Sequence, residues 1–243
     1  MHYNEFLEAV ENKSLRLSYS SLKNLLDSPK HFLDYFTKPR KESEAMKIGT
    51  LVHCLILEPN EVQNRYAVAD KPDKRTKVGK EEWSNILAAN DGKVLVSLDI
   101  YQQAESMANA VKSHYEFDLF EDITEFEKTF AIDYRGHKIQ GIVDALGSVI
   151  IDLKTTANAA PKKFKWSFFD FRYHVQAAIY TLAFPNRPYY IFAVDANCHV
   201  SVHEVSPETI EIGRQLLDQA LDQYEACEFV EKWDVSYDGI NIL

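Results

Sequence analysis

The chain has 243 residues, of which 46% are apolar and 26% charged, and its 27 basic and 37 acidic side chains give a formal net charge of −10. This composition excludes a disordered chain, a collagen and a small disulfide-rich scaffold, and the length suffices for a well-buried core. Cys54, Cys198 and Cys227 are too far apart for a disulfide framework or a paired metal motif, which favours a reducing compartment. No apolar run reaches the ~20 residues of a membrane-spanning helix and the N-terminus lacks an apolar signal core, so we expect a cytoplasmic protein without a membrane partner.

The acidic charge is concentrated near the C-terminus. Residues 204–238 hold ten acidic and two basic side chains, a net charge of −8, so the remainder is close to neutral. Nucleic-acid binding depends on local patches more than on totals. The net charge therefore lowers the expectation of DNA binding without excluding it.

Apolar periodicity predicts helices in the first half of the chain and both strands and helices in the second. Helical patterns cover 18–36 (two short helices, with Ser18 or Ser20 capping the first and Ser28-Pro29 starting the second), 46–58, 81–90, 98–115, 171–184 and 206–228. Strand-like patterns cover 124–133, 137–145, 148–154, 188–195 and 198–205, and the basic stretch 70–80 is expected to be a loop.

This order predicts one α/β domain with a mixed central sheet flanked by helices. We divide it into a mainly helical N-terminal part (1–115), a sheet with its helix (120–205), and an acidic C-terminal helix with a tail (206–243).

The main candidate for chemistry is a group of two aspartates and a lysine on neighbouring strands. Asp152 and Lys154 are two apart and project from the same strand face, and a hairpin would bring Asp144 next to Asp152. Adjacent carboxylates repel unless a cation lies between them, and few hard oxygen ligands suit Mg²⁺. The alternative is an Asp–Lys salt bridge at the rim of a strand pair. A metal site is favoured because these charges interrupt the apolar run Val149-Ile150-Ile151, where burial of a charge is costly.

Two further features accompany this group. Arg172, Gln176 and Tyr180 are spaced i, i+4, i+8 and would share one helix face, either as a solvated polar stripe or as a wall that contacts DNA phosphate or sugar. His53 lies in an apolar helix, where a histidine is more often a core residue than a ligand, and Glu58 is equally a helix-end carboxylate.

Together these residues resemble the PD-(D/E)XK nuclease superfamily, through Asp144, the Asp-Leu-Lys of 152–154 and Gln176-x-x-x-Tyr180. His53 in Gly-Thr-Leu-Val-His is similar to the RecB-like branch. The stretches Ile-Ile-Asp-Leu-Lys-Thr-Thr-Ala, Phe-Arg-Tyr-His-Val-Gln-Ala-Ala-Ile-Tyr and Tyr-Ser-Ser-Leu-Lys-Asn-Leu-Leu-Asp-Ser-Pro-Lys-His-Phe resemble the exonuclease VIII (RecE) C-terminal nuclease domain of phages and prophages. The resemblance runs from about residue 15 to residue 185.

The resemblance implies a role for each matching residue. Asp144 and Asp152 would bind metal, His53 would be an additional ligand, Lys154 would be the catalytic lysine, and Gln176 and Tyr180 would contact or support the substrate site. A further catalytic carboxylate is expected one strand earlier, with Glu127 as the candidate and Glu125 as the alternative, although an exposed strand carboxylate is an equal interpretation. Iron–sulfur relatives need four cysteines, so no cluster is expected here, and there is no helicase motif.

The implied activity is hydrolysis of linear double-stranded DNA, from its 5′ ends, with two Mg²⁺ ions that Mn²⁺ would replace, in phage-type recombination or DNA processing in a bacterial or infected host cell. A homo-oligomeric ring around DNA is expected, and the acidic C-terminal helix favours a protein partner such as a single-strand annealing protein. Candidate DNA contacts are the basic side chains of two clusters, and a solvated basic loop is an equal interpretation of each cluster. Phe164 and Trp166, which are interleaved with the lysines of the second cluster, would stack on a base or wedge it. These clusters are Lys71, Lys74, Arg75, Lys77 and Lys80, and Lys162, Lys163 and Lys165.

Two alternatives stay open at this point. The same site would serve an endonuclease, a nickase or a nuclease for single-stranded ends. The second alternative is a non-catalytic module that binds DNA ends or proteins. Such a module would not need Asp144, Asp152 and Lys154 together.

Overall fold

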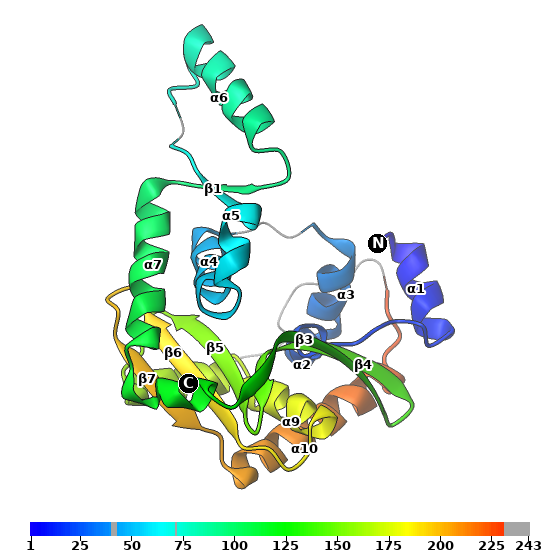
Figure 1. Ribbon diagram of the computed structural model, residues 1–243. Coiled ribbons are helices and arrows are strands. Elements are labelled where there is room, and N and C mark those ends of the chain that lie inside the picture. The colour runs from blue at the N-terminus through cyan, green and yellow to red at the C-terminus, as the bar shows by residue number, and fades with distance from the viewer. Residues whose placement is uncertain (40–42, 71, 231–243) are drawn as a thin grey trace, which may run out of the picture.

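The computed structural model describes residues 1–39, 43–70 and 72–230, and its centre is a five-stranded mixed sheet (Figure 1). The strand order is β3-β4-β5-β6-β7, in which β5 and β6 are parallel and the other neighbours are antiparallel. The strands are β3 (Ile123–Tyr134), β4 (His137–Gly147), β5 (Ile150–Thr156), β6 (Tyr189–Asp195) and β7 (Val200–Glu204). The predicted mixed sheet is confirmed, with each strand within a few residues of its expected range.

Helices cover both faces of this sheet. They are α1 (Tyr3–Glu11), α2 (Tyr19–Asp27), α3 (Pro29–Thr37), α4 (Glu44–Leu57), α5 (Val62–Arg65), α6 (Lys77–Ala89), α7 (Leu98–Lys112), α8 (Pro161–Asp170), α9 (Tyr173–Ala183) and α10 (Pro207–Ala226), with short 3₁₀ turns at Pro59–Glu61 and Tyr115–Phe120. Within the described residues, none of these helices combines the length and the apolar character needed to cross a bilayer.

Two hydrophobic cores follow from the alternation of side chains along the strands. Ile150 packs into a core shared with α1, α2, α3, α9 and α10. Its neighbour Ile151 points to the opposite face and packs with α4 and α7. The central strands are thus buried on both sides, which explains their continuous apolar runs.

Local cap signals explain where several helices begin. The Ser18 hydroxyl accepts a hydrogen bond from the backbone N–H of Ser21, which settles the choice between Ser18 and Ser20. Ser28 caps α3 in the same way, with Pro29 at the first helical position.

Several helices differ from the sequence expectation. The predicted loop at 70–80 ends at Thr76, whose hydroxyl accepts from the Gly79 N–H and starts α6. Segments α1 and α8 were not predicted, and the expected helix over 171–184 begins only at Tyr173 because Arg172 has a left-handed backbone (φ 58°).

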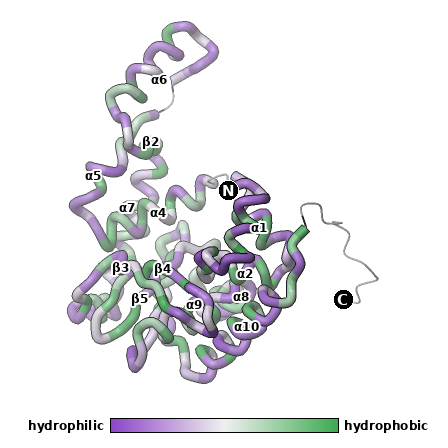
Figure 2. The backbone as a smooth tube through the Cα atoms, turned by 90° about the vertical axis from the view of Figure 1, so that its right-hand side faces the viewer, coloured by the Kyte–Doolittle hydropathy of each residue, from purple (hydrophilic) through white to green (hydrophobic). Residues whose placement is uncertain are grey.

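An arm formed by β1 (Tyr66–Val68), α6 and β2 (Val94–Val96) projects away from the central sheet (Figure 1). The two strands pair in parallel, with Tyr66 opposite Val94. Hydrophilic and hydrophobic residues both occur along the arm (Figure 2).

Candidate active site

Three neighbouring strands bring the predicted carboxylates together. Phe126 pairs with Ala145 and Lys128 with Val143, so the register of β3 and β4 sets Glu127 opposite Asp144. Asp144 reaches across to β5, where its Oδ2 accepts the backbone N–H of Leu153 at 2.7 Å.

A histidine from the helix above completes this cluster. Ligand atoms of His53, Glu127 and Asp144 all lie within 4.8 Å of one another, and His53 Nδ1 is 3.7 Å from Asp144 Oδ2. Helix α4 approaches β5 closely at Gly49, where an added Cβ would lie 2.9 Å from Thr155 Oγ1. Since His53 is four residues after Gly49, it lies on the same helix face, over the sheet. The small residue at this spacing was a signal for His53 that the sequence analysis did not use.

Of the two candidate glutamates, Glu127 is the one that lies in this cluster. Its backbone is left-handed (φ 48°), a conformation that is costly for a residue with a Cβ and that is frequent at functional sites. Glu125 is exposed, lies outside the cluster and forms an ion pair with Lys128.

Asp152 and Lys154 form a buried ion pair. The Asp152 side chain is 1% exposed and that of Lys154 15%, and Asp152 Oδ2 pairs with the Lys154 ammonium. Asp152 is not one of the three residues whose ligand atoms lie within 4.8 Å. In this geometry it orients the lysine beside the carboxylate–histidine cluster.

The helix α9 residues support this pair instead of forming a DNA-facing wall. Gln176 Nε2 donates to Asp152 Oδ1 at 2.8 Å, and the Tyr180 hydroxyl donates to the Ile142 carbonyl at 2.6 Å. Both side chains are buried because α9 is covered by the sheet on one side and by other helices on the other. Arg172 does not share their role: it precedes the helix and pairs with Asp27 of α2.

The electrostatics follow from burial and from neighbouring charge. Burial, assisted by Asp144, raises the pKa of Glu127 to about 7. Burial also raises the pKa of Asp152 to about 6, against the opposing effect of Lys154. Burial alone would lower the pKa of Lys154, but the carboxylates of Asp152 and Asp144 outweigh it and raise that pKa. The site therefore accumulates negative charge that a cation would stabilise.

A pocket of about 300 Å³ opens onto the cluster. Besides the three cluster residues it is lined by Gly49, Thr50, Cys54, Glu58, Arg65 and Tyr66. Glu58 holds the Arg65 guanidinium through two hydrogen bonds, so it is more than a helix-end carboxylate. Arg65 was not singled out from the sequence, where a lone arginine after a proline turn carries no signal.

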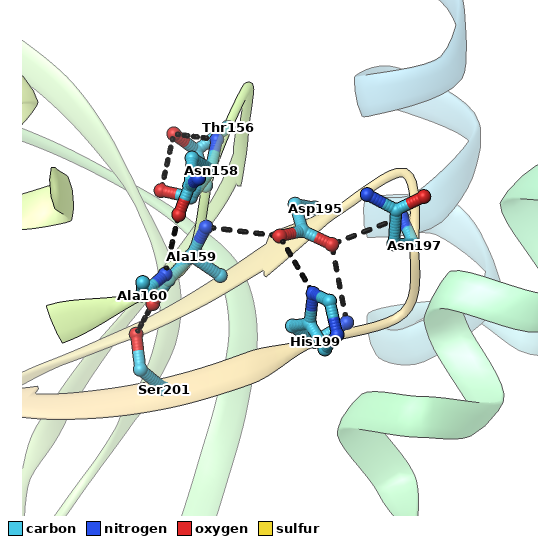
Figure 3. Close-up of polar contacts among 8 residues, drawn as sticks. All are labelled: Thr156, Asn158, Ala159, Ala160, Asp195, Asn197, His199 and Ser201. Atoms are coloured by element: carbon cyan, nitrogen blue, oxygen red, sulfur yellow. Dashed lines mark hydrogen bonds and ion pairs between the residues drawn. The ribbon is translucent and has the colours of Figure 1, made fainter.

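The connection from β5 to α8 is fixed by a buried aspartate (Figure 3). Asp195, at the end of β6, is 2% exposed and accepts the backbone N–H groups of Ala159, Asn197 and His199. Ser201 donates to the Ala159 carbonyl at 2.6 Å. These bonds hold the start of α8 at a set distance from the strand that carries Lys154.

The predicted DNA-contact residues have different surroundings. Lys162, Lys163 and Lys165 are exposed on α8, as is Trp166, but Phe164 is 1% exposed and packs in the core, so stacking on a base is wrong for it. On the arm, Lys74 lies 3.9 Å from the centroid of the Trp83 ring, and Arg75 pairs with Asp73. Lys71 and the tail from residue 231 lie outside the described residues.

The donor set fits a divalent cation. It combines two carboxylates and one imidazole whose ligand atoms lie close together, and burial, followed by the neighbouring Asp144, raises the pKa of Glu127. Carboxylate oxygens with an imidazole suit Mn²⁺, and the carboxylates with water suit Mg²⁺.

Fold and site together define a PD-(D/E)XK nuclease fold, and comparisons agree with it. The sequence family described as "PDDEXK-like domain of unknown function (DUF3799)" matches residues 18–242. Because the match spans most of the chain, the protein belongs to this family. No curated protein matches the chain. The exonuclease VIII branch stays a resemblance, since the family description does not name it.

Two solved structures are similar to the chain. A crystal structure described as "Putative exonuclease" from Eubacterium rectale has a TM-score of 0.60 and 13% identity, over 97% of this chain and 96% of that chain. At this identity the likeness shows a shared fold. A crystal structure of SSO0001 has a TM-score of 0.34 and 15% identity, over 86% of this chain and 87% of that chain.

Proposed function

We propose that the protein is a metal-dependent exodeoxyribonuclease that hydrolyses phosphodiester bonds of linear double-stranded DNA. The observation that carries the proposal is the juxtaposition of His53, Glu127 and Asp144 with the buried Asp152–Lys154 pair. A binding module has no need for a buried lysine beside a cation site, because that arrangement is costly unless it is used.

His53, Glu127 and Asp144 would hold the divalent cation, and Asp152 borders the same site. Bound Mg²⁺ or Mn²⁺ would lower the pKa of water and neutralise charge on the phosphate. The buried ion pair keeps the Lys154 ammonium protonated and fixed by Asp152, which Gln176 in turn orients. Such a fixed cation stabilises the negative charge that develops on the phosphate in the transition state.

Supporting features for a DNA substrate are the exposed lysines that begin α8, directly after the strand with Lys154. The 5′-to-3′ direction, the ring assembly and a role in phage-type recombination are part of the same proposal and derive from the resemblance to exonuclease VIII. An annealing-protein partner also belongs to it, although part of the acidic helix is engaged within the chain: Asp218 and Asp222 bind Arg135.

The test is digestion of a 5′-labelled linear duplex with Mg²⁺, beside EDTA, a covalently closed circle and the variant Lys154→Ala. The matched control is Lys30→Ala, which removes a half-buried lysine that pairs with Asp34 on α3. We expect the linear DNA to shorten from its ends, the circle to survive, and only Lys154→Ala to be inactive. Cleavage of the circle would make the enzyme an endonuclease. Binding of duplex ends without cleavage by Mg²⁺ or Mn²⁺ would replace the catalytic proposal by a binding module.

A further inference from the structure

A half-buried lysine without a carboxylate partner lies on α2, close to the active site. The Lys23 ammonium is 5.4 Å from the centroid of the Tyr19 ring and 5.8 Å from that of Phe171. Among the described residues, no carboxylate forms an ion pair with it. Its position is therefore defined by aromatic rings, which favour a cation over their faces but do not neutralise it.

The same rings connect Lys23 to the catalytic lysine. The Lys154 ammonium lies 4.8 Å from the centroid of Tyr173. The Tyr173 ring in turn contacts Tyr19 and Phe171, with centroid separations of 6.2 and 5.7 Å. One aromatic cluster (Tyr19, Phe171, Tyr173) thus separates two lysine ammonium groups.

Cations outnumber the paired carboxylates around this cluster. Lys154 is paired with Asp152 and Arg172 with Asp27, so Asp27 interacts with Lys23 only at longer range and Lys23 has no ion-pair partner among the described residues. Burial lowers the pKa of Lys23, partly opposed by Asp27 and reinforced by Lys154 and Arg172. An anion placed here would relieve the repulsion among the cations.

The cluster is held in place before any ligand arrives. The Tyr19 hydroxyl donates to the Phe171 carbonyl at 2.5 Å, and Arg172 donates to the Lys23 carbonyl at 3.3 Å. These contacts join α2 to the turn between α8 and α9. A lysine that projects from a fixed backbone loses less entropy when it binds an anion than a lysine on a mobile segment does.

There is space for a nucleotide beside the cluster. Phe171 is 48% exposed and, with Tyr173, lines a groove of about 570 Å³. The groove also includes Thr155 and Thr156, which directly follow Lys154 on β5. In the part of the chain that the structure describes, no lysine lines the groove itself, and Asp170 does, so the phosphates of a strand that enters it have their cationic partners at its border, at Lys154 and Lys23.

We propose that Lys23, framed by Tyr19 and Phe171, binds a second backbone phosphate of the DNA strand, next to the one that is cleaved beside Lys154. The inference rests on the proposed function and adds a substrate-binding residue to it. Its chemistry requires only a phosphodiester, so the contact is independent of base sequence.

The experiment measures duplex binding by fluorescence anisotropy in Ca²⁺ over a range of salt concentrations. The variants are Lys23→Gln, Lys23→Arg and, as the matched control, Lys30→Gln from the neighbouring helix α3, where the lysine pairs with Asp34. We expect Lys23→Gln to weaken binding roughly tenfold and to reduce the slope of log K against log salt by about 0.9. Lys23→Arg and Lys30→Gln should bind as the unaltered protein does.

A second measurement locates the phosphate, and its part on the unaltered protein does not depend on how a variant folds. Duplexes that carry one uncharged methylphosphonate linkage at successive positions are bound to the unaltered protein and to Lys23→Gln. The unaltered protein should lose affinity when the linkage next to the scissile one is uncharged, and Lys23→Gln should show no further loss there. The absence of a sensitive neighbouring linkage, or an unchanged salt slope in Lys23→Gln, overturns the inference. If the unaltered protein neither binds nor cuts DNA, the proposed function fails as well; if it cuts while Lys23→Gln binds normally, only the Lys23 contact fails.

Discussion

Replacing Glu127 by glutamine should remove most of the pH dependence of metal binding. With a pKa of about 7, the Glu127 carboxyl is ionised in about one tenth of molecules at pH 6 and about nine tenths at pH 8. A cation binds only the ionised form, so Mn²⁺ binding should be roughly tenfold weaker at pH 6 than at pH 8 from this group alone. Asp152, with a pKa of about 6, borders the site without being one of the three ligands, so its ionisation adds at most about a factor of two at pH 6.

Isothermal titration calorimetry with Mn²⁺ at pH 6, 7 and 8 measures this dependence. In Glu127→Gln the tenfold contribution should vanish and the smaller contribution of Asp152 should remain, while binding at pH 8 becomes weaker because a ligand is lost. Proton release on binding, read from buffers with different ionisation enthalpies, should fall in parallel.

Glu125→Gln is the matched control, since it makes the same chemical change two residues away on the same strand. Glu125 is exposed and pairs with Lys128, so its loss should leave both affinity and pH dependence unchanged. The reasoning is refuted if Glu127→Gln keeps the dependence of the unaltered protein, or if Glu125→Gln loses it.

The remaining predictions concern stability and turnover. The pKa values of Glu127 and Asp152 are higher in the folded protein than in the unfolded chain, so both carboxyls stabilise the metal-free protein fully below pH about 4. This stabilisation is lost as the pH rises through 6 to 7. The melting temperature in EDTA should therefore fall over that window, and a rise would contradict the assignment. Gln176→Leu should lower kcat more than DNA affinity. It should also move the acidic limb of the pH–rate profile to higher pH, because Asp152 loses a hydrogen bond that favours its ionised form. A profile at the same pH as that of the unaltered protein would rule this out. Gly213→Ala should lower the free energy of unfolding by about 1–3 kcal/mol in urea denaturation, because the new Cβ would lie 1.9 Å from the His174 carbonyl oxygen; an unchanged midpoint would show that α9 and α10 separate without cost.

The strand pattern made the pairing of Asp152 with Lys154 predictable from the sequence. Side chains two apart on a strand share a face, so Asp152 and Lys154 had to lie together, and the short link between β4 and β5 brought Asp144 beside them. Periodicity is a local property, and these relations need only local information.

Other features of the site depend on tertiary packing, so the local sequence pattern did not predict them. The helical spacing of Gln176 and Tyr180 was read correctly, but spacing does not show that both helix faces are covered, which turns a DNA-facing wall into a support for Asp152. Phe164 likewise lies among exposed lysines in sequence, yet α8 turns it into the core. The choice between Glu125 and Glu127 required the register of β3 against β4.

That register gives the acidic C-terminal helix a role within the chain. The turn between β3 and β4 has Arg135 and Gly136 at positive φ, and it is clamped by α10 through Arg135 to Asp218 and through His137 to Glu225 at 2.7 Å. A slip of one residue in this hairpin would send the Glu127 side chain to the opposite face of the sheet. The concentration of negative charge near the C-terminus, which at first argues against a DNA enzyme, therefore helps to hold the strand pairing that presents Glu127 to Asp144.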